Sequence, residues 1–240
     1  MNTAKPNFPS LDFPRPLVTV DVVMFTVLDD ALQVLLVRRP VNTAEPFPGK
    51  WALPGGFVNV DDDASLLDCA LRKLREKTGV VAPYLEQLGS WGGAGRDPRG
   101  WSATHCFYAL IPVQAMQLRS GANAADVAWF EVEAASRKRL AFDHGELLDA
   151  AIARLRSKVE YTSLPAFLLD EPFTLPALQH TYEVVLGRGV DKSAFRKRML
   201  DGGFMEEAGM LTGSLGRPAM SYRLRDRSQA GLFPRTFNAK

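Results

Sequence analysis

The chain has 240 residues, of which 46% are hydrophobic and 23% are charged, and its formal net charge is +2. These values are typical of a globular protein with one large or two modest domains. No apolar run approaches the roughly 18 residues of a membrane-spanning helix and the N-terminus does not resemble a secretion signal, so we expect a cytoplasmic protein without a membrane partner.

The first sixty residues predict a β-hairpin, a loop and a further short strand. Residues 17–28 and 32–37 are apolar and rich in β-branched side chains, and the turn signal Asp29 and Asp30 separates them. A polar loop at 39–50 follows. Residues 51–58 then combine a short strand with a glycine pair.

Residues 63–77 predict a helix. Ser65 and Asp68 have the spacing of a capping box, and Gly79 stands just past the end. The leucines expected on its buried face are Leu67, Leu71 and Leu74.

The next segments predict three strands and a second helix. Residues 88–91 and 101–113 are expected to flank a turn-rich loop at 93–100, and residues 127–132 form another strand. Residues 146–159 read as an amphipathic helix. Its apolar face consists of Leu147, Leu148, Ala151 and Leu155.

Only two cysteines, Cys69 and Cys106, occur, and they show no Cys-x-x-Cys spacing. Together with three scattered histidines they build neither a disulfide framework nor a zinc site. We expect both cysteines to be small buried hydrophobic residues in a reducing compartment. His144, which follows an aspartate at a helix start, is expected to serve in packing or capping.

The composition changes after residue 159. Residues 160–174 contain two prolines and no sustained period, which indicates a linker or docking segment. Two short helices and two short strands are predicted beyond it, at 175–186, 191–200, 206–211 and 220–224. The last two bracket a glycine- and proline-containing turn, so they predict a hairpin.

The C-terminal part is basic. From Arg188 onward eleven Lys and Arg stand against five Asp and Glu, so this segment carries +6 and the remainder −4. Such a segment suits a polyanion, although a solvated surface explains charge alone equally well.

In the second short helix, Phe195 and Met199 are expected to be buried and Asp191 to be the N-cap. The order helix, turn, basic helix and hairpin is typical of a winged helix, whose second helix enters the major groove of DNA. The candidate DNA contacts are Lys192, Ser193, Arg196 and Lys197, together with Arg217 at the tip of the hairpin.

The residues around the first helix resemble the signature of the Nudix family. Gly56 is followed by Arg72, Glu76, Gly79 and Val80, and the end of the signature matches in register. The resemblance implies an α/β/α sandwich, in which a loop and helix hold a divalent metal against a nucleoside diphosphate linked to another moiety.

The chain departs from this signature where the metal would bind. Two extra residues separate Gly56 from Arg72, and the three glutamate positions on one helical face are occupied by Lys73, Glu76 and Lys77. Ammonium groups cannot coordinate magnesium, so we predict no metal site and no efficient pyrophosphate hydrolysis. A minor alternative is that Glu76 and the acidic residues 61–63 still recruit a metal.

A Nudix-like cavity that cannot hydrolyse can still bind a ligand. Lys73 and Lys77 could neutralise a diphosphate, an arginine pair suits phosphate, and Trp51 offers either a stacking ring or a packed core aromatic. The candidate effector-binding residues are Arg38, Arg39, Trp51, Gly55, Gly56, Arg72, Lys73, Glu76 and Lys77.

The combination of both parts resembles the Nudix-related transcriptional regulators of bacterial NAD metabolism. The similar segments are 51–58, 97–100, 142–144, 186–188, 191–192, 195–196 and 216–219. The resemblance implies a homodimer that binds palindromic double-stranded operator DNA, with ADP-ribose or a related NAD metabolite as effector and no required cofactor.

We therefore predict an α/β protein, a Nudix-type α/β/α sandwich followed by a small C-terminal winged helix-turn-helix domain. The expected boundaries are a tail at 1–16, the effector domain at 17–159, a linker at 160–172, the DNA-binding domain at 173–228 and a tail at 229–240. The predicted function is a ligand-responsive repressor or other regulator of NAD biosynthesis or salvage genes. The alternatives are an active Nudix hydrolase with an accessory domain, and a ligand-binding module with a protein-binding tail.

Overall fold

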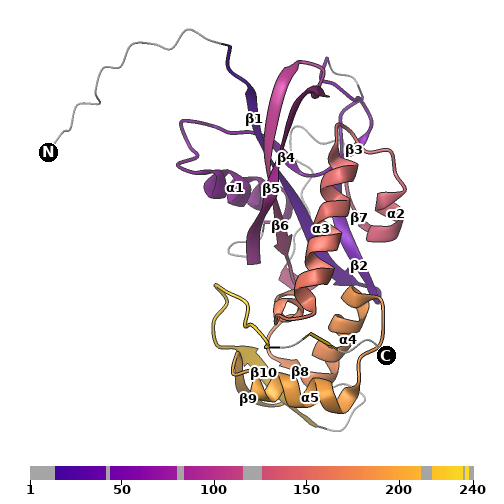
Figure 1. Ribbon diagram of the computed structural model, residues 1–240, viewed down its shortest axis with the longest axis vertical. Helices are drawn as coiled ribbons and strands as arrows, with labels where there is room; N and C mark the ends of the chain where they lie inside the picture. The colour runs from indigo at the N-terminus through magenta and orange to yellow at the C-terminus, as the bar shows by residue number, and fades with distance from the viewer. Residues whose placement is uncertain are drawn as a thin grey trace, which may run out of the picture.

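The computed structural model describes residues 14–41, 44–79, 84–115, 126–211, 218–234 and 236–237. Figure 1 shows a larger part built around a β-sheet and a smaller part, which carries the last helices and a hairpin. No helix among these residues is long and apolar enough to cross a membrane.

A seven-stranded sheet organises the larger part. Its central path runs β3-β2-β1-β6-β5, with β4 paired to β1 and β7 paired to β2. The strands are β1 (Leu17–Leu28), β2 (Ala31–Arg38), β3 (Trp51–Ala52), β4 (Gly55–Phe57), β5 (Tyr84–Asp97), β6 (Gly100–Leu110) and β7 (Asp126–Glu131), and a 3-10 turn, η1 (Val113–Ala115), follows β6. β1 and β6 are parallel, and the other paired strands in this sheet are antiparallel.

The predicted first hairpin is confirmed. Leu28 pairs with Ala31, and both turn residues between them have positive φ, 51° at Asp29 and 57° at Asp30. A two-residue turn with positive φ at both positions follows the right-handed twist of the strands, and aspartate tolerates this conformation better than most residues.

The predicted loop at 93–100 is wrong. β5 continues through Gly92 and Gly93, which pair with Ala103 and Ser102, and the register shifts between Gly93 and Asp97. The glycines resemble a loop in the sequence, but β6 supplies the backbone partners that keep them extended, with an irregularity typical of a glycine-containing strand.

Helices cover both faces of the sheet, which confirms the α/β/α sandwich (Figure 1). Val20 and Val22 of β1 pack in one cluster with α1 (Leu66–Thr78), whereas Val23 and Phe25 pack in the other with α3 (His144–Val159). Alternate residues of a strand point to opposite faces, so β1 serves both layers. A short helix, α2 (Val132–Ser136), precedes α3.

Helix α1 begins three residues later than predicted, because Ser65 is its N-cap and accepts a hydrogen bond from the Asp68 amide at 3.2 Å. It ends at Gly79, whose φ is 72°. The predicted buried face is partly wrong, since Leu67 is 47% exposed. The side chains buried on this helix are Cys69, Ala70, Leu74 and Thr78. Cys69 and Cys106 are free and buried, as predicted.

The smaller part is a winged helix. It contains a 3-10 turn, η2 (Leu164–Leu168), then β8 (Phe173–Thr174), α4 (Leu175–Leu186), α5 (Lys192–Asp201), β9 (Met205–Leu211) and β10 (Ala219–Leu224), with a sheet in the order β8-β10-β9. Thr174 and Asp191 cap α4 and α5 through their side chains. Phe195 and Met199 are buried on α5, which confirms the prediction.

The segment between the two parts is packed into the core. All five residues of η2 are buried, and the Phe167 ring lies 4.8 Å from the Tyr84 ring of β5. Of the two predicted descriptions, a loose linker and a docking segment, the structure supports docking for 164–168. A single hydrophobic cluster consequently runs from β1 through α3 and η2 to α5.

Candidate functional site

A cavity of about 540 Å³ opens where β1, the β3–β4 turn, α1, the β5–β6 hairpin and the start of α3 meet. Its charged lining consists of the cations Arg39, Arg72, Lys73, Lys77, Arg96 and Arg99 and the anions Asp21, Glu45 and Asp97. Six cations against three anions leave a net charge of +3. Such a cavity favours a ligand with several negative charges.

His144 adds no charge to this lining. It is buried at the first turn of α3, and its Nδ1 accepts a hydrogen bond from the Leu53 amide at 2.9 Å. Burial lowers the pKa of His144, which favours the neutral imidazole. The residue therefore supports the backbone beside the glycine pair, in agreement with the predicted packing role.

Buried charges form the floor of the cavity. Arg96 donates from Nη2 to Asp21 at 3.0 Å and from Nε to Asp143 at 2.8 Å, and its side chain is only 6% exposed. Thr104 donates to the same Asp21 oxygen at 2.7 Å. Sequence reasoning missed Arg96 and Asp21, although an aspartate inside the apolar strand β1 was a signal.

The rim of the cavity combines arginines with aromatic rings. Arg99 lies 5.0 Å over the Phe57 ring and forms ion pairs with Asp97 and Glu45. Arg39 donates to the Pro46 carbonyl at 2.7 Å and lies 5.1 Å over the Phe142 ring. Each guanidinium is thus held in place before a ligand arrives.

Arg72 of α1 bonds to two acidic side chains, one in the loop before the helix and one on the helix itself. It donates to both oxygens of Asp63, at 2.8 and 2.6 Å, and to Glu76 at 3.0 Å. The hydrogen bonds from Arg72 hold the pKa of Asp63 well below its usual value. Asp63 and Glu76, the carboxylates best placed to bind a metal, are therefore paired with Arg72.

Two lysines of α1 line the cavity, and one of them lies beside the glycine pair. Lys73 Nζ is 3.2 Å from the position that a Cβ at Gly56 would take, and it is 3.6 Å from Glu76. Lys77 lines the same wall, and burial lowers its pKa. These side chains do not fit a magnesium ion, which requires oxygen ligands. No group of three His, Cys, Asp or Glu residues that could hold a metal lies within the described part of the chain.

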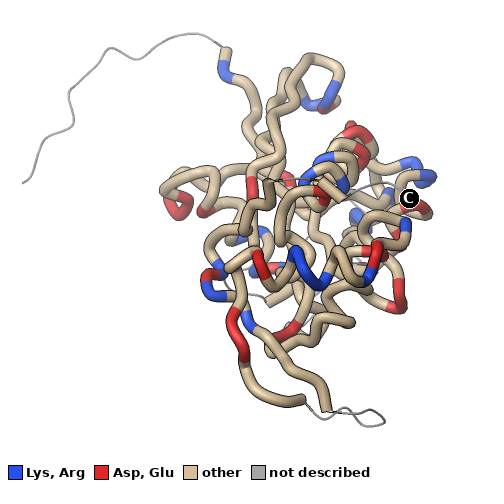
Figure 2. The backbone as a smooth tube through the Cα atoms, turned by 60° about the horizontal axis from the view of Figure 1, so that its bottom comes forward, with Lys and Arg blue, Asp and Glu red and all other residues tan. Residues whose placement is uncertain are grey.

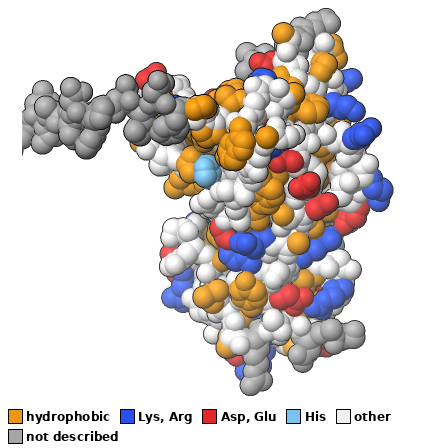
Figure 3. Space-filling model, turned by 45° about the horizontal axis from the view of Figure 1, so that its top comes forward, with side chains coloured by type: hydrophobic (Ala, Val, Ile, Leu, Met, Phe, Trp, Pro, Cys, Tyr) orange, Lys and Arg blue, Asp and Glu red, His pale blue; other side chains and the backbone are white. Residues whose placement is uncertain are grey.

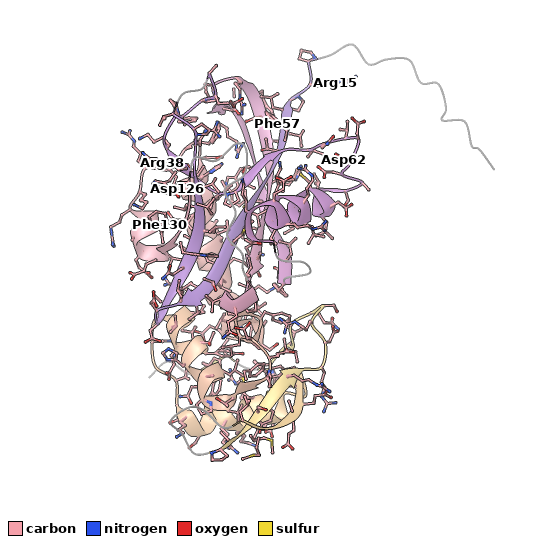
Figure 4. The ribbon with its side chains drawn as sticks, turned by 180° about the vertical axis from the view of Figure 1, so that it is seen from behind. Arg15, Arg38, Phe57, Asp62, Asp126 and Phe130 are labelled. Atoms are coloured by element: carbon pink, nitrogen blue, oxygen red, sulfur yellow. The ribbon has the colours of Figure 1, made fainter. Side chains whose placement is uncertain are left out.

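The structure brings together six of the nine predicted effector residues, namely Arg39, Gly55, Gly56, Arg72, Lys73 and Lys77. Arg38, Trp51 and Glu76 do not line the cavity. Arg38 is exposed and pairs in the sheet with Asp126; Figure 4 shows it beside Asp126 and Phe130, away from Phe57.

Trp51 points to the same side of the sheet as Phe130. The two rings meet edge to face, with centroids 4.9 Å apart. Of the two predicted roles of Trp51, this contact favours the packed core aromatic. Ala52, the next residue, lines the cavity.

Gly55 is expected to tolerate no side chain. A Cβ there would lie 2.0 Å from Asp21 Oδ1 and 2.7 Å from the Val20 carbonyl, so Gly55→Ala should destabilise the protein by about 3 kcal/mol. Gly145→Ala is the matched control, because nothing lies within 4 Å of its Cβ and alanine favours the helix. Urea unfolding of both variants measures the difference, and equal midpoints would contradict the close approach.

The candidate DNA contacts on α5 share one exposed surface. Lys192, Ser193, Arg196 and Lys197 are all exposed. Figure 2 marks the positions of the basic residues in blue along the backbone of α5, which lies next to the β9–β10 hairpin. Lys197 forms an ion pair with Asp201 at 2.8 Å. Arg217, the predicted wing-tip residue, lies outside the described residues.

Comparisons with known proteins match both parts. Residues 18–151 match the model of the NUDIX domain, and residues 165–224 match the model of the NrtR DNA-binding winged helix domain. The ADPR responsive transcriptional repressor NtrR of Acinetobacter baylyi is 45% identical, over 93% of this chain and 88% of the relative.

Two solved structures of Shewanella oneidensis NrtR are similar. One is NrtR complexed with a 27mer DNA, at 44% identity and a TM-score of 0.83, covering 92% of this chain and 99% of the other. The other is its NUDIX domain complexed with ADP ribose, at 46% identity and a TM-score of 0.56, covering 62% of this chain and 94% of the other.

Proposed function

Because this chain belongs to the family of NUDIX-domain proteins that carry an NrtR-type DNA-binding winged helix, we propose that it is an ADP-ribose-responsive transcriptional repressor. The observation that carries the proposal is a single chain with a cavity of net charge +3 in one part and an exposed cationic helix in the other. The genes it controls are proposed to be those of NAD biosynthesis or salvage.

The effector site that we propose is the cavity. Lys73, Lys77 and Arg72 line the same cavity as the glycine pair, so they are assigned to the diphosphate, which carries two negative charges. Arg96 and Arg99, which sequence reasoning missed, extend this positive wall. These assignments replace Arg38, Trp51 and Glu76 of the predicted set.

The DNA site that we propose is the exposed surface of α5, together with the following hairpin. Lys192, Ser193, Arg196 and Lys197 are assigned to the major groove of duplex DNA, and Arg217 keeps its predicted role at the wing tip. The two domains are proposed to span residues 17–159 and 173–228.

A homodimer on a palindromic operator is part of the proposal, since a two-fold protein matches a two-fold site. Large apolar side chains are exposed on neighbouring strands at one end of the sheet: Val18 at 37%, Phe57 at 44% and Trp101 at 52%. Figure 3 shows hydrophobic side chains gathered there, and this surface supports association of two copies.

We propose that the protein binds its effector without metal and does not hydrolyse it. Since Lys73 and Lys77 provide the positive charge, affinity for ADP-ribose should change by less than about threefold between excess magnesium and excess EDTA. Isothermal titration in both buffers measures this, and AMP release is assayed in parallel at high protein concentration. Magnesium-dependent release of AMP would support the alternative, an active Nudix hydrolase.

The experiment that tests the whole proposal is fluorescence anisotropy on duplex DNA from upstream of the gene, with and without ADP-ribose, beside a scrambled duplex. Sequence-dependent binding that ADP-ribose shifts is the expected result. Equal binding to both duplexes that salt abolishes would indicate counterion release alone and would contradict the proposal. Absence of binding to any duplex at low salt would favour the third alternative, a protein-binding tail.

A further inference from the structure

Helix α3 connects the cavity with the DNA-binding part. At its N-terminal end, Asp143 accepts the hydrogen bond from Arg96 and His144 lines the cavity. The helix has 16 residues, so it spans about 24 Å at 1.5 Å per residue. A displacement at the cavity floor therefore reaches its C-terminal end as a movement of one rigid element.

The segment that follows α3, residues 160–163, is here called the junction. Three side chains of the winged helix bond to it. Tyr182 of α4 donates to the Thr162 carbonyl at 2.7 Å, Arg188 pairs with the Glu160 carboxylate at 2.7 Å, and Arg198 of α5 donates to the Glu160 carbonyl at 3.3 Å. The junction is thus held by both helices of the DNA-binding motif.

The C-terminal residues 230–234 and 236–237 contact the junction and α5. Gly231 and Ser163 exchange hydrogen bonds, and Phe233 donates to the Tyr161 carbonyl at 2.8 Å. Phe237 is buried against Phe195 of α5. This segment lies beyond residue 224, where the match to the winged-helix model ends.

Arg198 of α5 contacts both the junction and the C-terminal segment. Its Nη1 donates to Glu160 and its Nη2 to the Thr236 carbonyl at 2.7 Å, while the guanidinium lies 3.9 Å over the Phe237 ring. Arg196 and Lys197, its neighbours, are exposed on the surface assigned to DNA. Arg198 therefore faces the effector domain from the helix that meets the operator.

The ion pair between Arg188 and Glu160 in the junction leaves one nitrogen and one oxygen without a partner among the described residues. Arg188 Nη2 and Glu160 Oε1 are bonded, whereas Arg188 Nη1 and Glu160 Oε2 are buried without a partner among the described residues. An arginine and a carboxylate can pair through two parallel hydrogen bonds, so a bidentate pair that engages all four atoms would be a second arrangement of this contact. Transmission between sites requires such an element with two arrangements.

We propose that Arg198 is a positioning residue, which together with the junction transmits effector occupancy from α3 to α5. This inference rests on the proposed function. It predicts that, without the Arg198 hydrogen bonds, each site still binds its own ligand. The affinity for operator DNA then no longer depends on ADP-ribose.

The test uses the full chain and the coupling factor, defined as the ratio of operator Kd values with and without saturating ADP-ribose. Coupling in regulators is typically about 5- to 150-fold, and we expect the wild type to fall in this range. Arg198→Met keeps an unbranched side chain at this position but removes the donors, so its factor should fall below about 2. Arg198→Lys should retain part of the coupling, and Arg137→Met, at an exposed arginine of the effector domain, should retain all of it.

Reciprocity provides the second readout. In the wild type, operator DNA must change the Kd for ADP-ribose by the same factor, whereas in Arg198→Met this Kd should be equal with and without DNA. Arg188→Met tests the junction independently if the first variant fails to fold. Unchanged coupling in a folded Arg198→Met or Arg188→Met protein would overturn the inference. Absence of ADP-ribose or operator binding in the wild type would instead refute the proposed function.

Discussion

Replacement of Arg196 by alanine is expected to weaken operator binding by about 10- to 100-fold, the range for loss of one base-contacting arginine. Arg196 is exposed on α5, whereas Phe195 and Met199 of the same helix are buried, so its removal creates no cavity. Fluorescence anisotropy with the operator duplex measures the Kd. Affinity for ADP-ribose should be unchanged, because the cavity lies in the other domain.

Arg137→Ala is the matched control for this variant. It removes an exposed arginine at the end of α2, so it changes the net charge equally without touching α5. Operator affinity of this control should stay within about threefold of the wild type, as is usual for a surface charge remote from the DNA. An equal loss in both variants would mean that total charge, not α5, determines DNA binding.

The double variant Lys73→Glu and Lys77→Glu is expected to lose at least about 100-fold in affinity for ADP-ribose, since each reversal turns an attraction of a few kcal/mol into a repulsion. Both lysines line the cavity, and Lys73 lies beside Gly56, where we place the diphosphate. Isothermal titration in EDTA measures the loss without a contribution from divalent metal.

Lys50→Glu is the control for this double variant. Lys50 is exposed and does not line the cavity, so its reversal should change the affinity by less than about threefold. Operator binding by the double variant in the absence of ADP-ribose should match the wild type, which also shows that it is folded. A double variant that still binds ADP-ribose tightly would place the diphosphate elsewhere in the protein.

Local signals account for the elements that the sequence predicted correctly. The caps Ser65, Thr174 and Asp191 act on amides within three residues, and the buried pair Phe195 and Met199 is one helical turn apart. Such patterns are complete within ten residues, so no distant segment is needed to interpret them. The departure from the Nudix signature at Lys73 and Lys77 is likewise visible within a few residues of the sequence.

The wrong expectations concern segments whose conformation depends on a distant partner. The glycines of β5 are extended because β6 pairs with them, and η2 is buried because β5 and α4 cover it. Leu67 is exposed because the packing of α1 on the sheet selects the stripe around Cys69 and Leu74. Periodicity identifies a helix but does not by itself specify which stripe meets the sheet.

By itself, the sequence determined the class of both domains, the basic character of α5 and the presence of lysines at positions 73 and 77. Only the tertiary structure decided which arginines line the cavity: Arg39 does and its neighbour Arg38 does not, and Arg96 reaches Asp21 from 75 residues away. It also decided that Arg198 faces the junction and not the DNA surface. Composition and capping are properties of neighbouring residues, whereas a cavity is formed by side chains that only packing brings together.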